Sequence, residues 1–208
     1  MNALFDLDGT LTDPGDGFVA CVSYALEELD CRRRTDHEIR RHIGPPLQET
    51  LALLLDDRSM IPQALALYRE RYGTEGLFGC TVYPGIAETL AALRSRRMTL
   101  MVATSKPTAY AKRILDHHGL SKYFDAVYGS ELDGTRARKT ELISHLLRSE
   151  SIEKAVMVGD RAQDMAAALA HGLHPVGALW GYGSREELAG AGAAALCERP
   201  HDLPSLLL

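Results

Sequence analysis

The stretch that decides the fold is residues 4–13, with the sequence LFDLDGTLTD. An apolar run leads into Asp6 and Asp8, which are followed by Gly9 and Thr10. Residues i and i+2 of a strand face the same side, so we expect both carboxylates to point together at the end of a first strand. Two like charges this close are unfavourable unless they share a cation or a proton. Asp-Gly is also common in turns. Whether these aspartates form a functional site or only a turn therefore depends on what the rest of the sequence contains.

Short apolar runs alternate with amphipathic stretches along most of the chain. We expect strands at residues 2–5, 99–103, 126–128, 155–158 and 175–179. Several of these runs are almost wholly apolar, as is typical of parallel strands covered on both faces. Helical patterns lie at residues 86–97, 107–118, 140–149 and 162–171. The alternation predicts the α/β class, with a doubly wound parallel sheet.

Residues 15–80 break this rhythm. They contain only helical patterns, at residues 18–29, 36–42, 47–55 and 62–72. We therefore expect an all-helical domain, residues 15–80, inserted into a sheet domain made of residues 1–14 and 81–208. Gly15, Gly17 and the turn Tyr83-Pro84-Gly85 are the expected hinges between the two.

The composition excludes several classes of protein. The chain has 208 residues, of which 46% are apolar and 25% charged, and its net charge is −5. We expect no nucleic-acid partner, because such proteins carry a basic patch, and no membrane span, because no apolar run approaches about 20 residues. The N-terminus has no secretory pattern and the four cysteines have no metal-like spacing, so we expect a cytoplasmic protein with reduced thiols. A monomer and a small homo-oligomer both fit the sequence.

Acidic residues also follow a second predicted strand. Asp160 comes directly after the apolar residues 155–158 and Gly159, and Asp164 would lie in the first turn of the next helix. Taken alone, Asp160 is also compatible with a helix cap. Together with Asp6 and Asp8, however, these residues make an oxygen-rich site of the kind that Mg²⁺ prefers.

Two further signals are weaker when taken singly. Thr104 and Ser105 end a strand just before a helix that starts near Pro107. Hydroxyl groups and free amides at such a place hold phosphate oxygens well, although simple capping would give the same pattern. Lys139 lies at a helix start, where the helix dipole disfavours a cation, so another group is expected to hold it.

In this order and context, these motifs resemble those of the haloacid dehalogenase-like hydrolase superfamily. The matching segments are Asp6 to Thr10, Thr104-Ser105, Lys139, and Gly159 through Asp164. The resemblance covers the whole chain and is strongest to the branch of phosphoglycolate phosphatases and 5′-nucleotidases, which implies a Rossmann-like core and a helical cap that closes over the site. Ser105 stands where many relatives have Asn. The dehalogenases lack the second aspartate, so Asp8 argues against dehalogenation.

The resemblance implies a role for each residue. Asp6 would attack phosphorus to form an aspartyl-phosphate, and Asp8 would act as general acid and then as general base. Mg²⁺ would be bound by the Asp6 carboxylate, the Asp8 carbonyl and Asp160, with support from Asp164. Residues that would contact the phosphoryl group or the substrate are Gly9, Thr10, Thr104, Ser105 and Lys139, of which Thr104 and Lys139 also count as catalytic.

The expected function is that of a Mg²⁺-dependent phosphatase for a small phosphorylated metabolite, phosphoglycolate or a nucleoside 5′-monophosphate. A phosphosugar mutase of the β-phosphoglucomutase type uses the same core residues and stays open. So does a non-catalytic module that binds phosphorylated ligands.

Overall fold

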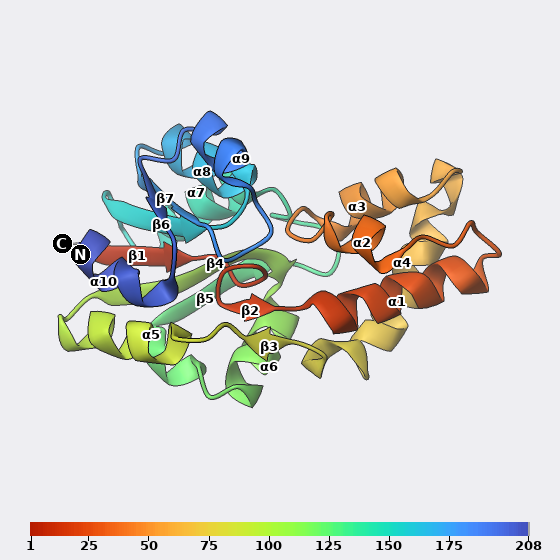
Figure 1. The fold of residues 1–208 in the computed structure, drawn as a ribbon, viewed down its shortest axis with the longest axis horizontal. Coiled ribbons are helices and arrows are strands. Elements are labelled where there is room, and N and C mark those ends of the chain that lie inside the picture. The colour runs from red at the N-terminus through yellow and green to blue at the C-terminus, as the bar shows by residue number, and fades with distance from the viewer. Residues whose placement is uncertain (208) are drawn as a thin grey trace. The chain divides into compact units, whose positions relative to one another are not determined.

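The structure is a computed structural model that describes residues 1–207 (Figure 1). It divides into two compact units. Unit 1 consists of Met1–Asp13 and Val82–Leu208, and unit 2 is the intervening segment Pro14–Thr81. Each unit is described by itself below.

A six-stranded sheet forms the centre of unit 1, with the strand order β5-β4-β1-β6-β7-β8. Every neighbouring pair in it is parallel. The strands are β1 (Asn2–Phe5), β4 (Thr99–Pro107), β5 (Ala126–Ser130), β6 (Ala155–Gly159), β7 (His174–Ala178) and β8 (Ala195–Cys197). The predicted α/β class is thereby confirmed. Strand β8 was not predicted, because a three-residue stretch of Ala, Leu and Cys has neither the length nor the β-branched side chains that mark a strand.

Helices cover the sheet on both sides. Figure 1 shows α5 (Ile86–Ser95) and α6 (Thr108–His117) on one side, and α7 (Lys139–Ser149) and α8 (Ala162–Ala170) on the other. Two short helices, α9 (Arg185–Gly190) and α10 (Leu203–Leu206), complete the unit and escaped prediction because of their length. One buried cluster joins α7 and α8 to the sheet: Leu4, Met101, Ala103, Leu142, Ile143, Leu146, Ala155, Met157, Ala167, Ala168 and Leu173.

The order of the strands explains where a site can form. From β1 the chain moves to β4 and β5 on one side, and then returns to β6 on the other side of β1. In open α/β sheets ligands bind at such a switch point, beyond the carboxyl ends of the strands. Leu4 belongs to the cluster under α7 and α8, and strand alternation puts Asp6 on the same face. The Asp6 amide still donates to the Val158 carbonyl at 2.9 Å, so this residue continues the line of β1.

Unit 2 contains four α-helices and no strand between residues 15 and 80. They are α1 (Gly15–Glu28), α2 (Asp36–Arg40), α3 (Leu47–Leu54) and α4 (Ile61–Tyr72), with 3₁₀ turns at Arg58–Met60 and Gly76–Phe78. A small two-stranded sheet, β2 (Thr12–Asp13) with β3 (Thr81–Val82), lies where the chain leaves and re-enters unit 1.

Across the described residues, none of the helices combines the length and the apolar character that a membrane span requires.

Gly17, one of the expected hinges, packs closely against the end of unit 2. It lies in the first turn of α1, and its amide donates to the Gly79 carbonyl at 2.9 Å. A Cβ atom on Gly17 would come within 2.2 Å of the Gly76 carbonyl oxygen. The missing side chain therefore permits close packing of α1 against the segment that contains Gly76 and Gly79.

Candidate active site

Lys139 holds two aspartates together beyond the carboxyl end of β1. It is the first residue of α7, and its Nζ lies 2.9 Å from Asp6 Oδ1 and 2.9 Å from Asp164 Oδ1. The same ammonium donates to the Ala103 carbonyl at 2.9 Å. Burial alone would lower the pKa of Lys139, but the carboxylates of Asp164 and Asp6 raise it above its ordinary value. The sequence predicted that another group holds this lysine, because the helix dipole disfavours a cation at the N-terminus of α7, and the partners are the two carboxylates.

Asp160 lies beside this group in a space that glycines keep open. Its Oδ1 accepts from the Thr10 hydroxyl at 3.0 Å, and its Oδ2 accepts from the Tyr182 amide at 2.9 Å. A Cβ atom on Gly9 would lie 2.1 Å from Asp160 Oδ2, and one on Gly181 would lie 2.4 Å from Asp160 Cβ. Side chains at these two positions would displace the carboxylate.

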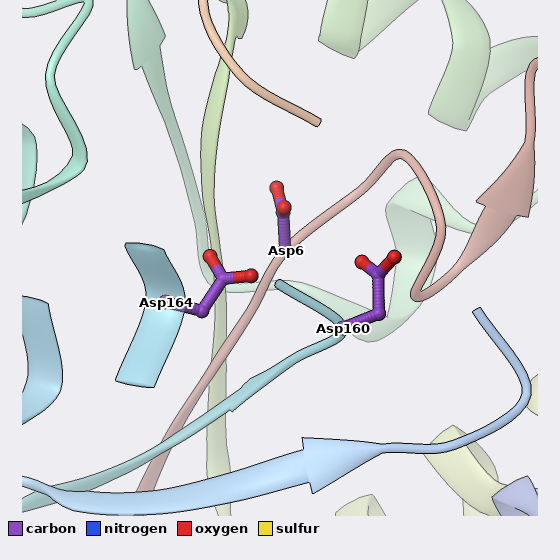
Figure 2. A group of neighbouring side chains, drawn as sticks. All are labelled: Asp6, Asp160 and Asp164. Atoms are coloured by element: carbon purple, nitrogen blue, oxygen red, sulfur yellow. The ribbon is translucent and has the colours of Figure 1, made fainter. Parts of the chain in front are cut away.

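The carboxylates of Asp6, Asp160 and Asp164 form a compact cluster (Figure 2). Asp6 and Asp160 directly follow β1 and β6, and Asp164 lies in the first turn of α8. All three are buried, and one oxygen of each lies within 4.8 Å of the others. Burial raises the pKa of Asp160 well above its ordinary value, and the neighbouring carboxylates raise it further. Burial also raises the pKa of Asp164, although Lys139 opposes that shift.

This cluster fits a divalent cation. The ammonium of Lys139 pairs with two of the three buried carboxylates, those of Asp6 and Asp164, and no ion pair to Asp160 is present among the described residues. Buried charges in proteins are paired or coordinate a metal. The donors are all oxygens of hard carboxylates, which is the donor set of Mg²⁺ sites.

The two aspartates that follow β1 (Asn2–Phe5) have different lysine partners. That both carboxylates point together stays a prediction. Asp8 Oδ1 accepts from Lys106 Nζ at 2.7 Å, whereas Asp6 pairs with Lys139. Burial raises the pKa of Asp8 above its ordinary value, and Lys106 opposes the shift. A raised pKa keeps the proton on a carboxyl group over a wider pH range, which suits general acid catalysis.

Thr104 and Ser105 lie in the C-terminal part of β4, where its pairing with β5 becomes irregular. Thr104 is buried, and its hydroxyl accepts from the Lys106 amide at 3.2 Å. The Ser105 hydroxyl is buried and has no hydrogen-bond partner among the described residues. Buried polar groups are nearly always hydrogen-bonded, so an unpaired hydroxyl at this place is consistent with a bound ligand.

Gly9 and Thr10, which were expected to contact phosphate or substrate, already have protein partners. The Gly9 amide donates to the Thr12 carbonyl at 2.7 Å, and the Thr10 hydroxyl is the donor to Asp160. Thr10 is also fully buried. In this structure both residues support the Asp160 carboxylate, because the loop after β1 turns back on itself.

Several residues that shape the site were not predicted to do so. Lys106 is one of them. The sequence feature that could have indicated it is a cationic residue directly after the two hydroxyl residues Thr104 and Ser105. Trp180 Nε1 donates to the Thr10 carbonyl at 2.9 Å, and the Tyr182 hydroxyl donates to Asp13. No local pattern in the sequence links the stretch that contains these two aromatic residues to residues 10 and 13, because the contacts span about 170 positions of the chain.

Glu187 supports the second acidic segment from a distance. Its Oε1 accepts from the Ala162 amide at 2.9 Å and from Arg161 Nε at 3.0 Å. The Arg161 amide donates in turn to Asp164 Oδ2 at 3.0 Å. These bonds satisfy amides at the N-terminus of α8 and fix the carboxylate of Asp164.

Comparison with known proteins identifies the family. The model of the haloacid dehalogenase-like hydrolase family matches residues 3–178. The chain is 44% identical over 190 residues to a 5′-nucleotidase of Pseudomonas aeruginosa, covering 90% of this chain and 86% of the relative. It is 32% identical over 181 residues to a phosphoglycolate phosphatase of Aquifex aeolicus, covering 86% and 84%. A crystal structure of a predicted phosphatase from Clostridium acetobutylicum superposes with a TM-score of 0.94 at 37% identity, covering 99% of this chain and 97% of the other. The chain therefore belongs to the haloacid dehalogenase-like hydrolase family.

Proposed function

We propose that the protein is a Mg²⁺-dependent phosphatase that hydrolyses small phosphomonoesters through an aspartyl-phosphate on Asp6. The observation that carries the proposal is the buried cluster of Asp6, Asp160 and Asp164, with Lys139 in contact with two of its members. The separate Asp8–Lys106 pair supplies a second carboxyl group for proton transfer. The site thus holds a nucleophile, an acid and cations at one edge of the sheet.

The chemistry divides between the two aspartates that follow β1. An oxygen of Asp6 forms a bond to phosphorus while the bond from phosphorus to the ester oxygen breaks. The proton of Asp8 passes to that ester oxygen, which leaves as an alcohol. Asp8, now a carboxylate, takes a proton from a water molecule that attacks phosphorus, and this second step releases phosphate and restores Asp6.

The cations of the site offset the negative charge of the phosphoryl group. Lys139 and the unpaired Ser105 hydroxyl would contact phosphoryl oxygens, with Thr104 beside them. Asp6, Asp160, Asp164 and the Asp8 carbonyl would hold Mg²⁺. When bound, the metal supplies the positive charge that lets a carboxylate approach a phosphate dianion.

The substrate is a small phosphorylated metabolite, with phosphoglycolate and nucleoside 5′-monophosphates as the two candidate classes. The names of the relatives from Pseudomonas aeruginosa and Aquifex aeolicus support these two classes. Unit 1 contains every residue assigned above and is the proposed catalytic core, and unit 2 is the proposed cap.

The test is phosphate release from a panel of phosphorylated compounds, with Mg²⁺ and with a chelator. The panel contains phosphoglycolate, nucleoside 5′-monophosphates, sugar phosphates and 4-nitrophenyl phosphate. We expect metal-dependent release by the native protein and a loss of at least about 10³-fold in Asp6→Asn, because the nucleophile is gone. The control is Asp36→Asn, which makes the same chemical change at an exposed position of α2.

The outcomes separate the proposal from its rivals. A well-folded native protein that releases no phosphate from any compound contradicts it. A mutase would instead convert a sugar phosphate to its isomer with little free phosphate. A binding module would retain its ligand in Asp6→Asn and turn nothing over.

A further inference from the structure

Lys106 has a buried ammonium group, and the reaction proposed above assigns no role to it. Its Nζ lies 2.7 Å from Asp8 Oδ1, and the two side chains are 7% and 18% exposed. Lysine is rarely buried to this extent unless it is paired. The protein therefore places this ammonium beside Asp8 at a cost, and the question is what the pair does.

The backbone of β4 is distorted where it presents Lys106. Thr104 pairs with Gly129 of β5, but the next pair joins Pro107 to Ser130, so two extra residues are taken up between them. Bulges of this kind redirect side chains and are frequent beside active sites. A regular strand would have placed residues 105 and 106 on opposite faces of the sheet.

Neighbouring residues hold this bulge in place. The Ser130 hydroxyl donates to the Ser105 carbonyl at 2.8 Å, and the Gly129 amide donates to the Thr108 hydroxyl at 3.1 Å. A Cβ atom on Gly129 would lie 2.4 Å from the Lys106 carbonyl oxygen. The position of Lys106 is thus built into the sheet and does not depend on a flexible loop.

The two lysines serve the two aspartates separately. Lys139 contacts Asp6, the proposed nucleophile, and Lys106 contacts Asp8, the proposed acid. An ammonium group only donates hydrogen bonds, so Asp8 Oδ1 is an acceptor toward Lys106. A proton on the Asp8 carboxyl group therefore belongs on the other oxygen, Oδ2.

We propose that Lys106 is a positioning residue that fixes the Asp8 carboxyl group and leaves Oδ2 to exchange the proton with the leaving group. The inference rests on the proposed function. In the first step the Oδ2–H bond breaks and the proton passes to the ester oxygen as the phosphorus–oxygen bond breaks. Lys106 keeps all its protons throughout.

The test uses leaving groups that differ in their need for a proton. An alkoxide leaves poorly without one, whereas 4-nitrophenolate leaves readily. We expect Lys106→Met to lower kcat/KM by about 10²-fold for the best alkyl phosphate of the panel, a typical contribution of general acid catalysis, and by less than about 10-fold for 4-nitrophenyl phosphate. The parameter kcat/KM is chosen because it reports the steps up to the first bond cleavage and excludes hydrolysis of the phosphoenzyme.

Three other variants complete the design. Lys112→Met removes the same charge from an exposed position of α6 and should behave as the native protein does. Lys106→Arg retains a cationic donor and should restore part of the lost alkyl activity. Lys106→Gln is a second neutral variant, measured in case Lys106→Met folds poorly, and each variant is checked by circular dichroism and thermal unfolding.

Equal losses on both leaving groups, or no loss on either, would overturn the inference, because a phosphate-binding or purely structural role does not distinguish the leaving groups. Failure of the proposed function looks different. In that case the native protein releases no phosphate from either class, or Asp6→Asn releases it undiminished.

Discussion

At the scale of single residues, the site depends on a backbone conformation that few residues adopt. Gly9 has φ = +85°, in the region that favours glycine. The same residue leaves the space that Asp160 Oδ2 occupies, since a Cβ atom there would lie only 2.1 Å away. Both the backbone conformation and the close contact with Asp160 therefore require glycine at position 9.

Gly9→Ala should lower both activity and metal binding, which a glycine substitution away from the site should not do. We expect a loss of at least about 10²-fold in kcat/KM together with weaker Mg²⁺ binding, because the new methyl group displaces a carboxylate that would hold the metal. The measurements are phosphate release and isothermal titration with Mg²⁺. A native-like titration in Gly9→Ala would contradict this prediction.

Gly119→Ala is the matched control for that change. Gly119 also has a positive φ, of +64°, but no atom lies within 4 Å of the Cβ position. The substitution should therefore cost about 1 kcal/mol of stability for the strained backbone and leave phosphate release unchanged. The comparison isolates the contact with Asp160 from the cost of the conformation.

At the scale of elements, the start of α2 shows how a sequence signal becomes a stable helix end. The Thr35 hydroxyl accepts from the Glu38 amide at 3.2 Å, and Glu38 Oε2 accepts from the Thr35 amide at 2.8 Å. This reciprocal pair is a capping box, and it satisfies amides that the helix itself leaves unpaired. Hydrogen bonds from the Thr35 amide and hydroxyl hold the pKa of Glu38 below its ordinary value.

Thr35→Ala should lower the free energy of unfolding by about 1 kcal/mol, as is usual for loss of an N-cap side chain. Urea titration followed by circular dichroism measures it. Thr140→Ala, an exposed position in the first turn of α7, is the control and should change stability by less than about 0.5 kcal/mol. A Thr35→Ala variant as stable as the control would contradict the prediction.

The same box should depend on pH in a defined direction. Because the pKa of Glu38 is lowered in the folded protein, its contribution is present above the ordinary pKa of glutamate, about 4.3, and is lost as the pH falls through the lower folded value. The stability difference between the native protein and Glu38→Gln should therefore shrink on acidification below about pH 4. A difference that grows on acidification would contradict the assignment.

At the scale of the whole molecule, we expect the buried carboxylates to make stability depend on a bound cation. Burial raises the pKa values of Asp160 and Asp164, so the metal-free folded protein binds more protons than the unfolded chain does. For such groups the stabilising contribution is complete below the unfolded pKa and is lost as the pH rises through the folded pKa. The metal-free protein should thus lose stability between mildly acidic and alkaline pH, and a bound cation should restore it.

We therefore expect Mg²⁺ to raise Tm relative to a chelator, and to raise it more at pH 8 than at pH 5.5. At about 100 times Kd the gain is about 2.7 kcal/mol, which corresponds to a rise of roughly 5–10 °C for a chain of this size. Differential scanning calorimetry at matched ionic strength measures the shift. Asp160→Asn should reduce it strongly, whereas Asp36→Asn should leave it intact, and an equal shift in both variants would contradict the assignment of Asp160.

The class of the fold could be predicted from the sequence, and so could the residues of the candidate site. Strand β1 has the predicted bounds, Asn2–Phe5, and the helix after β6 begins at Ala162 as predicted. These features are local, since an apolar run, a helical period and the residues that follow them are all read within about 15 positions. The same local reading placed acidic residues at the ends of two strands.

The tertiary structure alone decided which groups meet. The hydrogen bond from Lys106 to Asp8 joins residues 98 positions apart, and that from Trp180 to Thr10 spans 170 positions. The bulge in β4 that presents Lys106 depends on its pairing with β5, and the glycine at position 9 makes sense only once Asp160 lies against it. No periodicity encodes such contacts, because they arise only when separate strands of one sheet bring their carboxyl ends to a common edge.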